Sequence, residues 1–291
     1  MKPPIFDYVA ATSIDMATAA MAAAGGDAKI LAGGQSLMPM LNFRLLRPSI
    51  LVDINRIAGL SYIEADERSL RIGALTRHYQ LETSPLIAKA FPVVACAMTH
   101  VAHLAIRNRG TIGGSLSHAD PAAELPMLAI LLDAELDIAS ANGSRTIPAR
   151  EFFLDALTVD LDGTEVLTEI TLPKLPEATG WGFQEVARRH GDFALAAVGV
   201  LLTASGGAIK KARIALTGVG PTPQRAAAAE ALLTGHAPEP DLVGRVIEAV
   251  RAAIAPETDL HASADYRRHL AGVLTGRAIA QAWRRAHETV L

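Results

Sequence analysis

The sequence is poor in cysteine and carries little net charge. Its 291 residues include one cysteine, Cys96, so the chain forms no intramolecular disulfide and holds no cysteine-only metal or iron–sulfur site. Lys and Arg number 27 against 30 Asp and Glu, and the resulting net charge of −3 argues against a nucleic-acid partner. No run of about 20 apolar residues is present, and the first apolar stretch lacks a basic flank, so neither a membrane span nor a signal peptide is expected. We therefore expect a cytoplasmic protein.

What is present is the composition of a packed globular protein. The chain is 50% hydrophobic and 20% charged, and its length suggests two domains at roughly 100 to 200 residues per domain. Two prolines in the segment 172–176 oppose a continuous helix or strand. We predict a first domain at residues 1–174, with subdomains of about 1–57 and 58–174, and a second domain at 177–291.

The local patterns predict an α+β fold. A helix is expected after the capping residue Ser13, ending at Gly25-Gly26, followed by a strand, a glycine turn, a helix and a strand over 29–54. The first domain continues with hairpins over 61–76 and 135–147, helices over 85–104 (broken at Pro92) and 120–132, and a strand over 165–172. The second domain is expected to contain strands at 181–187, 195–203 and 208–217 and helices at 224–233, 241–254 and 264–287.

Two glycine pairs are the strongest candidates for a ligand site. Gly33-Gly34 precedes Gln35-Ser36-Leu37, and a second pair lies within Thr111–Ser115. Glycine lets the backbone approach a ligand closely and leaves amides free to bind an anion. Two such loops converging on one ligand would suit a diphosphate, whereas a single glycine pair after a strand is more often an ordinary turn. Neither loop matches the dinucleotide fingerprint or the Walker A motif, so the residues by themselves do not name the ligand.

Four motifs together resemble the FAD-binding medium subunit of molybdenum hydroxylases, the family of aerobic carbon monoxide dehydrogenase and multi-subunit xanthine dehydrogenase. They occur in the expected order and cover nearly the whole chain: Ala32-Gly33-Gly34-Gln35-Ser36-Leu37, Thr111-Ile112-Gly113-Gly114-Ser115, His118-Ala119-Asp120-Pro121-Ala122-Ala123-Glu124 and Ser263-Ala264-Asp265-Tyr266-Arg267-Arg268-His269-Leu270.

The resemblance implies both a fold and a set of cofactor contacts. The fold would be a vanillyl-alcohol-oxidase-like (PCMH-type) FAD-binding domain of two subdomains, followed by an α+β domain with a three-stranded antiparallel sheet and helices. The pyrophosphate of FAD would lie over residues 33–37, next to Ala32, with further contacts from Thr111, Gly114 and Ser115. Asp120 would lie near the adenosine half and Leu167 near the flavin ring. The residues alone explain Asp120 equally well as a helix N-cap before Pro121.

The implied function is electron transfer within a larger enzyme. A large partner subunit would hold the molybdenum cofactor and a small partner two [2Fe-2S] clusters, in a dimer of heterotrimers. Electrons would pass from a cluster through FAD to NAD, oxygen or a quinone, and this chain would contribute no catalytic acid or base and no metal ligand. Two other functions stay open: a self-sufficient FAD oxidoreductase, and a non-catalytic module that binds a different anion.

One position departs from the pattern of the resembled family. Many relatives carry a lysine near the flavin after the first strand of the second domain, whereas this chain has Glu185. A lysine there would stabilise negative charge on the reduced flavin. Its absence predicts either a lower flavin reduction potential or a replacement of the cation by Arg188 or Arg189. Asp120 and Glu124 lie four residues apart, and such acidic pairs on a helix are usually solvated, so we do not expect them to act as a catalytic pair.

Overall fold

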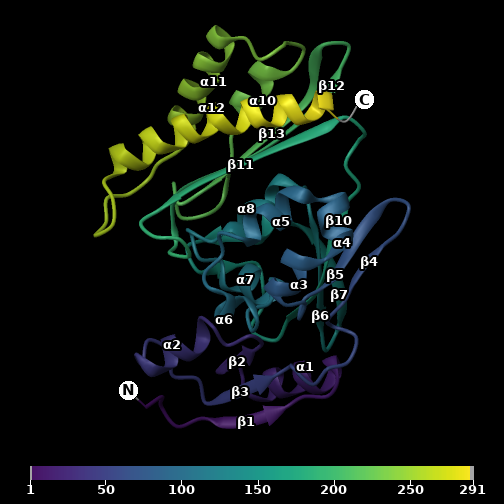
Figure 1. Ribbon diagram of the computed structural model, residues 1–291. Helices are drawn as coiled ribbons and strands as arrows, with labels where there is room; N and C mark the ends of the chain where they lie inside the picture. Colours follow the sequence, from purple (N-terminus) through teal and green to yellow (C-terminus); the bar gives the residue numbers. More distant parts are fainter. Residues whose placement is uncertain (1, 289–291) are drawn as a thin grey trace.

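The computed structural model describes residues 2–288 and arranges them in three stacked layers (Figure 1). A three-stranded sheet lies in the N-terminal layer, a five-stranded sheet in the middle layer and a four-stranded sheet in the C-terminal layer. Each layer adds its own helices, so the fold is α+β, as the sequence predicts.

The N-terminal layer is a small parallel sheet with two helices. It contains β1 (Asp7–Ala10), α1 (Ile14–Ala23), β2 (Ala28–Leu31), α2 (Leu37–Asn42) and β3 (Ile50–Asp53), with strand order β1-β3-β2. The predicted cap is confirmed, because the Ser13 hydroxyl accepts a hydrogen bond from the Met16 amide at 3.1 Å. The helix after the first glycine pair is present and ends at Asn42, and Arg44 follows in the left-handed conformation (φ 58°).

The middle layer combines an antiparallel sheet with a group of short helices. Its elements are β4 (Ile63–Ala65), β5 (Ser69–Gly73), α3 (His78–Thr83), α4 (Pro85–Ala90), α5 (Pro92–Met98), α6 (Leu104–Arg107), α7 (Ile112–His118), α8 (Glu124–Leu131), β6 (Glu135–Ser140), β7 (Gly143–Pro148), α9 (Ala149–Phe152), β8 (Phe153–Asp155), β9 (Thr158–Val159) and β10 (Val166–Pro173). The large sheet has the order β4-β5-β10-β6-β7. The expected break at Pro92 is confirmed, since α4 ends at Ala90 and α5 begins at Pro92.

Two sequence-based expectations in this layer are wrong. The second glycine pair lies inside helix α7, not in a loop between a strand and a helix. Asp120 is not a helix N-cap, because α8 begins four residues later, at Glu124. The Asp120 carboxylate instead accepts a hydrogen bond from the Ala122 amide at 2.9 Å, which forms a local turn.

The C-terminal layer is an antiparallel sheet with three helices. It comprises β11 (Thr179–Ala187), β12 (Ala194–Ser205), β13 (Ala208–Thr217), β14 (Gln224–Arg225), α10 (Ala227–Leu233), α11 (Pro240–Ala253) and α12 (Ala264–Glu288). The three predicted strands are present, and Gln224–Arg225, predicted as the start of a helix, forms a short fourth strand. Helix α12 packs closely on β11, where a Cβ at Gly182 would overlap the backbone of Ala278.

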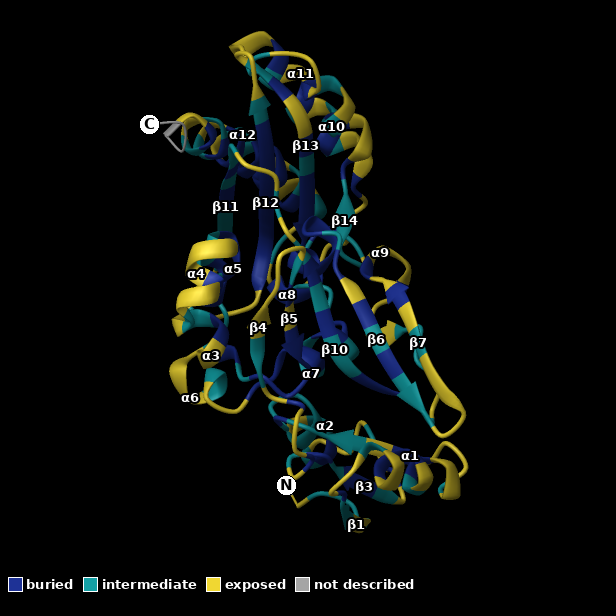
Figure 2. Cartoon of the chain, turned by 90° about the vertical axis from the view of Figure 1, so that its right-hand side faces the viewer, coloured by how far each residue is buried: buried dark blue, intermediate teal, exposed yellow. Residues whose placement is uncertain are grey.

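The two faces of the C-terminal sheet contribute to different cores. One face packs under α10 and α12, on which α11 packs in turn, with Val200, Ile214 and Leu274 among the buried residues. The other face joins the core of the middle layer through Phe183, Leu201 and Ala215. Strand β12 is therefore buried along most of its length (Figure 2).

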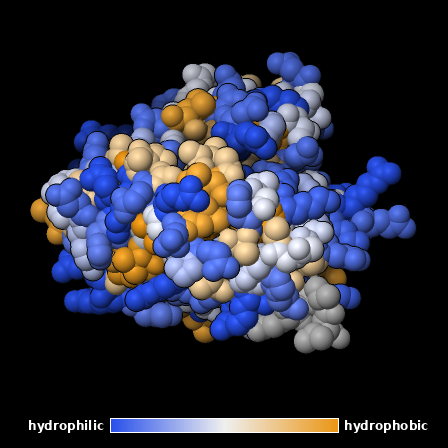
Figure 3. All heavy atoms as spheres, turned by 90° about the horizontal axis from the view of Figure 1, so that it is seen from above, coloured by the Kyte–Doolittle hydropathy of each residue, from blue (hydrophilic) through white to orange (hydrophobic). Residues whose placement is uncertain are grey.

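The face of the molecule seen from above carries both polar and apolar side chains (Figure 3). Seen from above, hydrophilic side chains surround smaller apolar areas (Figure 3). Among residues 2–288, no helix is both long enough and apolar enough to cross a bilayer.

Candidate cofactor site

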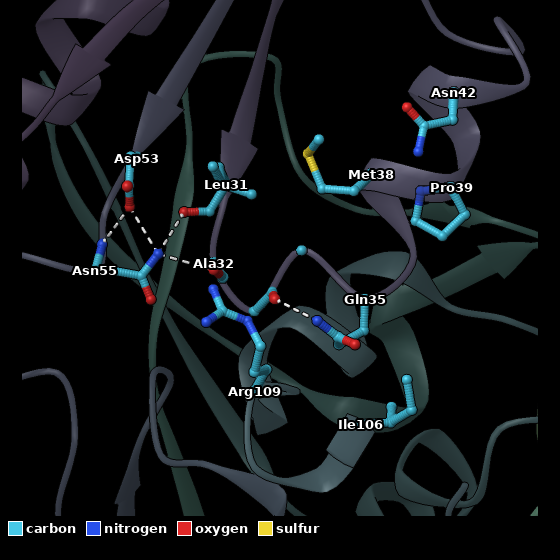
Figure 4. A pocket seen from close by; sticks show the side chains of 12 residues that line it. Leu31, Ala32, Gln35, Met38, Pro39, Asn42, Asp53, Asn55, Ile106 and Arg109 are labelled. Carbon is cyan, nitrogen blue, oxygen red and sulfur yellow. Dashed lines mark hydrogen bonds between the residues drawn. The ribbon is translucent and has the colours of Figure 1, made fainter. Parts of the chain in front are cut away.

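A pocket of about 500 Å³ opens between the N-terminal layer and the turn that precedes α7 (Figure 4). The end of β2 and the turn at Gly33–Gln35 line one part of it, and Met38, Pro39 and Asn42 of α2 line another. Asn55, after β3, and Arg109, after α6, complete the wall. Three segments that are distant in sequence thus meet around one concave space, which is the usual form of a small-molecule site.

The turn at Gly33–Ser36 presents unpaired backbone donors. The amides of Gly33, Gly34, Gln35 and Ser36 make no hydrogen bond to any residue within 2–288, and the Ser36 hydroxyl makes none either. Gly34 adopts φ 73°, a conformation that L side chains rarely adopt. The Gln35 side chain donates to the Gly33 carbonyl at 3.0 Å and so holds the turn in shape. Free amides on a glycine turn are a suitable cradle for a phosphate.

The turn at Gly33 packs directly on the segment that precedes α7. A Cβ at Gly33 would overlap the carbonyl oxygen of Arg109 and approach the Cα of Gly110 to 2.9 Å. A Cβ at Gly114 would lie 3.9 Å from the Cβ of Ala32. The structure therefore brings the two glycine segments together, across almost 80 positions of sequence.

The second glycine segment does not offer free amides, which corrects the expectation of two amide-lined loops. The Ile112 amide donates to the Thr76 carbonyl and the Gly113 amide to the Ala74 carbonyl. The Gly114 amide donates to the Thr111 hydroxyl at 3.1 Å, which makes Thr111 the N-cap of α7, and the Ser115 amide donates to the Thr111 carbonyl. The hydroxyls of Thr111 and Ser115 and the close backbone approach at Gly114 are what this segment can contribute.

A network under the pocket joins its walls and was missed by sequence reasoning. The side-chain amide of Asn55 donates to the carbonyls of Leu31 (3.3 Å) and Ala32 (2.8 Å) and to the Asp53 carboxylate (2.6 Å). The Arg77 guanidinium donates to the Asn55 side-chain oxygen at 2.7 Å and to the Arg109 carbonyl. Arg77 and Asn55 therefore fix the first glycine turn relative to the segment before α7.

Asp53 is held ionised within this network. Partial burial acts to raise its pKa, but hydrogen bonds from Tyr8 and Asn55 outweigh the burial and hold the pKa below its usual value. Two polar residues, Asp53 and Asn55, come directly at the end of the buried parallel strand β3. Polar residues at this edge of a parallel sheet are a signal that sequence reasoning can use. Arg77 gives no comparable signal in the sequence.

His78 supports the second glycine segment from below. Its ring is buried, and its Nε2 lies 3.0 Å from the Thr111 carbonyl. Burial lowers the pKa of His78 to about 4, so the ring is neutral near pH 7 and Nε2–H donates to that carbonyl. Its Nδ1 is buried without a hydrogen-bond partner among the described residues. His78 therefore positions the N-cap residue of α7 without carrying a charge.

Of the predicted contact residues, only Ala32, Gly33, Gly34 and Gln35 line this pocket. The other predicted residues of the two glycine segments adjoin the lining without belonging to it: Ser36, Leu37, Thr111, Gly114 and Ser115. Two further predicted residues belong to neither glycine segment. Asp120 is half-buried in the turn between α7 and α8, and Leu167 is buried in β10. The pairing of β10 with β6 is irregular between Leu167 and Glu169. Their roles toward the adenosine and the flavin ring stay predictions.

Comparison with known families and structures decides the assignment. Residues 4–175 match the model of the FAD binding domain in molybdopterin dehydrogenase, and residues 181–282 match the CO dehydrogenase flavoprotein C-terminal domain. The chain belongs to this family of FAD-binding subunits. It is an oxidoreductase subunit with the fold of a carbon monoxide dehydrogenase medium chain, and its cofactor is FAD.

Individual relatives match this chain over almost its full length. The 6-hydroxypseudooxynicotine dehydrogenase complex subunit alpha of Paenarthrobacter nicotinovorans is 42% identical over 99% of this chain and 98% of its own length. The caffeine dehydrogenase subunit beta of a Pseudomonas species is also 42% identical, over 97% of this chain and 96% of its own. A solved carbon monoxide dehydrogenase from Hydrogenophaga pseudoflava superposes with a TM-score of 0.96 at 41% identity, covering 98% of this chain and 99% of that one.

Proposed function

We propose that this chain binds FAD in the pocket beside Gly33–Ser36 and relays electrons from the [2Fe-2S] clusters of a partner subunit to an external acceptor. The observation that carries the proposal is the set of four free amides on a turn that a side chain would block. Bound FAD supplies the chemistry, because its flavin ring accepts and releases electrons. The chain's own residues bind and orient it.

Each part of the pocket has a separate task in this proposal. The amides of Gly33, Gly34, Gln35 and Ser36 hold the diphosphate, with the Ser36 hydroxyl and Leu37 beside them. The Thr111 and Ser115 hydroxyls and the backbone at Gly114 give further contacts from the adjoining wall. Arg109 lines the same pocket and places a guanidinium where it can offset the charge of a diphosphate. Asp120 and Leu167 complete the proposed set, toward the adenosine and the flavin ring.

The proposed assembly follows the named relatives. Subunits of molybdenum hydroxylase complexes are among the chains that match this one over almost their full length. We propose a large molybdopterin-binding partner and a small [2Fe-2S] partner, arranged as a dimer of heterotrimers. The division into residues 1–174 (about 1–57 and 58–174) and 177–291, and the cytoplasmic location, stay predictions. The substrate is specified outside this chain.

The Gly34→Ala variant tests the proposed site. A methyl group there meets Leu31 Cδ1 at 3.2 Å and Met38 Cγ at 3.3 Å, and φ 73° strains the backbone, so the turn reshapes and loses its amide cradle. We expect the Kd for FAD, measured by titration of flavin fluorescence, to rise at least about tenfold, or about 1.4 kcal/mol.

The Gly207→Ala variant is the matched control. Gly207 has φ 78° but nothing within 4 Å of an added Cβ, and it lies in the turn between β12 and β13. It reproduces the backbone strain without touching the pocket, so it should bind FAD like the wild type. Equal FAD affinity in the two variants would contradict the site.

Failure of the wild type to take up FAD would favour an anion-binding module, and reduction of its flavin by a substrate without partner subunits would favour a self-sufficient oxidoreductase.

A further inference from the structure

Glu185 is a buried carboxyl that forms no ion pair with a Lys or Arg within residues 2–288. It lies on β11, on the face of the strand that meets the middle layer, two positions after the core residue Phe183. Its side chain is 2% exposed, and its Oε2 has no hydrogen-bond partner among the described residues. An ionised carboxylate in such a place is strongly unfavourable unless it is paired, so the neutral acid is the stable form.

Neither of the expected cationic substitutes, Arg188 and Arg189, forms an ion pair with Glu185 within residues 2–288. Arg188 instead lies 3.4 Å from His261, and Arg285 stacks over the Trp181 ring at 3.5 Å, at the other end of β11. The titratable group that does approach is His100, which follows α5 and whose Nδ1 lies 3.8 Å from Glu185 Oε1. His100 is itself stacked on His190, at 6.3 Å, and tilted against Phe183, at 5.2 Å.

Glu124 is the second buried acid at this interface, which corrects the expectation that it is solvated. It begins α8, and the residue is only 5% exposed. Burial is the main cause that raises the pKa of Glu124 to about 7, and the nearby Asp120 adds to it. Burial, and then the charge of Glu124, raise the pKa of Glu185 to about 8. Two neighbouring buried carboxyls cannot both ionise without a large cost, so they titrate as a pair.

His100, the histidine beside the pair, does not supply a positive charge near pH 7. Burial and the neighbouring His190 lower the pKa of His100, so its ring is neutral and cannot form an ion pair with Glu185. Burial likewise raises the pKa of Cys96 on α5, and the strand partner of Glu185 on β12 is Ala197. In the described part of the chain, no group of three or more His, Cys, Asp or Glu side chains is arranged to hold a metal ion. A bound proton therefore neutralises the buried carboxyl, in place of an ion pair or a metal ion.

We propose that Glu185, Glu124 and His100 form a proton-holding site between the middle and C-terminal layers, and that its ionisation responds to the charge on bound FAD. Glu185 carries the proton near pH 7, and His100 is the neutral ring beside it, with its Nδ1 3.8 Å from Glu185 Oε1. The site connects to the pocket through two helices, α8 and α7, which pack on each other. The first turn of α7 lies beside Ala32, at the pocket. The proposed response of this ionisation to the charge on FAD rests on the proposed function. The protonation of Glu185 in the absence of FAD does not.

The protonation of Glu185 in the absence of FAD is tested on the full chain. Infrared spectra of protein carrying isotope-labelled glutamate report the C=O stretch of a protonated carboxyl. We expect the wild type to show this band near neutral pH and to lose it as the pH rises past about 8. The Glu185→Gln variant, which keeps the shape of the side chain, should lose the Glu185 part of the band, and a control with the exposed Glu257 changed to Gln should keep it. A wild type and a Glu185→Gln variant with the same band would overturn the proposal.

The response to FAD is tested on the loaded protein. Glu185 is a positioning residue here, so the readout is the flavin midpoint potential as a function of pH in the wild type and in Glu185→Gln and Glu257→Gln. The wild type and Glu185→Gln should agree below the pKa of Glu185, where both side chains are neutral. Above it, the wild-type potential should fall below that of Glu185→Gln, by up to a tenfold change in the reduction equilibrium per pH unit, or about 30 mV for two electrons.

The outcomes separate this proposal from the proposed function. A difference in potential between wild type and Glu185→Gln that stays constant with pH would overturn the response to FAD while FAD binding stands. A chain that takes up no FAD would overturn the proposed function and this response with it, and the infrared result would still decide whether Glu185 holds a proton.

Discussion

At the scale of single residues, Asn55 connects more of the cofactor site than any predicted residue does. Its side chain contacts the Leu31 and Ala32 carbonyls on one side and Arg77 on another. We predict that Asn55→Ala raises the Kd for FAD about tenfold, because the turn at Gly33 loses its anchor and two carbonyls lose a donor, with about 1–3 kcal/mol lost from the free energy of unfolding. Flavin fluorescence titration and urea unfolding measure the two effects.

The exposed Asn142, in the turn between β6 and β7, provides the control. Asn142→Ala removes the same side chain far from the pocket and should leave FAD affinity unchanged. If Asn55→Ala bound FAD as tightly as Asn142→Ala does, Asn55 would have no part in shaping the site.

The residues that the sequence reveals are those whose role is local. Gly34 is recognisable because a turn with φ 73° needs glycine, and Ser13 because it caps the helix that follows it. Arg77 and His78 act on segments more than 30 positions away, on the carbonyls of Arg109 and Thr111, and no local pattern marks them. Glu124 is expected to be solvated and is instead buried, because its burial comes from the packing of layers and not from its own helix.

At the scale of elements, the Thr111 cap determines how helix α7 starts. We predict that Thr111→Ala costs about 1 kcal/mol of the free energy of unfolding, because the Gly114 amide loses its hydrogen-bond partner. The same change should weaken FAD binding, since Thr111 stands beside the pocket. Urea unfolding and FAD titration provide the measurements.

Thr111→Ser keeps a hydroxyl at the cap position and serves as the matched variant. It should retain most of the stability and most of the FAD affinity. Equal losses in Thr111→Ser and Thr111→Ala would show that the methyl group, and not the cap, is what matters at this position.

Elements with a strong local pattern were predictable, and elements made by packing were not. The hairpins, the break at Pro92 and the three long strands of the C-terminal layer carry turn residues or apolar runs that define them. Helix α7 has two glycines in its first turn, which disfavour helix, and it exists because Thr111 and the Ala74 carbonyl satisfy its first amides. The same glycines are required by space, as a Cβ at Gly113 would come within 2.6 Å of the Ala74 Cβ.

At the scale of the whole molecule, the C-terminal layer is fixed to the cofactor-binding layers by a shared core and by two arginines. Phe183, Leu201 and Ala215 enter the same buried cluster as Leu128 of α8. Arg225, on β14, donates to the Ile130 carbonyl at the end of α8 at 2.9 Å and contacts the Asp133 carboxylate at 3.0 Å. Cations at this end of a helix also offset its dipole. Glu185 lies in the same interface, so movement of the layers would change its surroundings.

Asp133 is the acceptor on which this polar contact between layers depends. Its two oxygens bind Arg213 at 2.7 Å and Arg225 at 3.0 Å, and both arginines are largely buried. Asp133 has φ 51°, a left-handed conformation that Asn adopts more readily than most residues, so Asp133→Asn removes the charge without adding backbone strain. We predict that this variant loses about 1–3 kcal/mol of the free energy of unfolding in urea, because two buried cations lose a charged acceptor.

The exposed pair Arg251–Glu248 is the control for this last prediction. It is also an Arg–carboxylate contact, at 2.6 Å, but its glutamate side chain is 68% exposed, and it lies within α11 without joining layers. Glu248→Gln should therefore cost at most about 0.5 kcal/mol. If Asp133→Asn cost no more than Glu248→Gln, the arginine contacts would be incidental and the apolar core alone would hold the C-terminal layer in place.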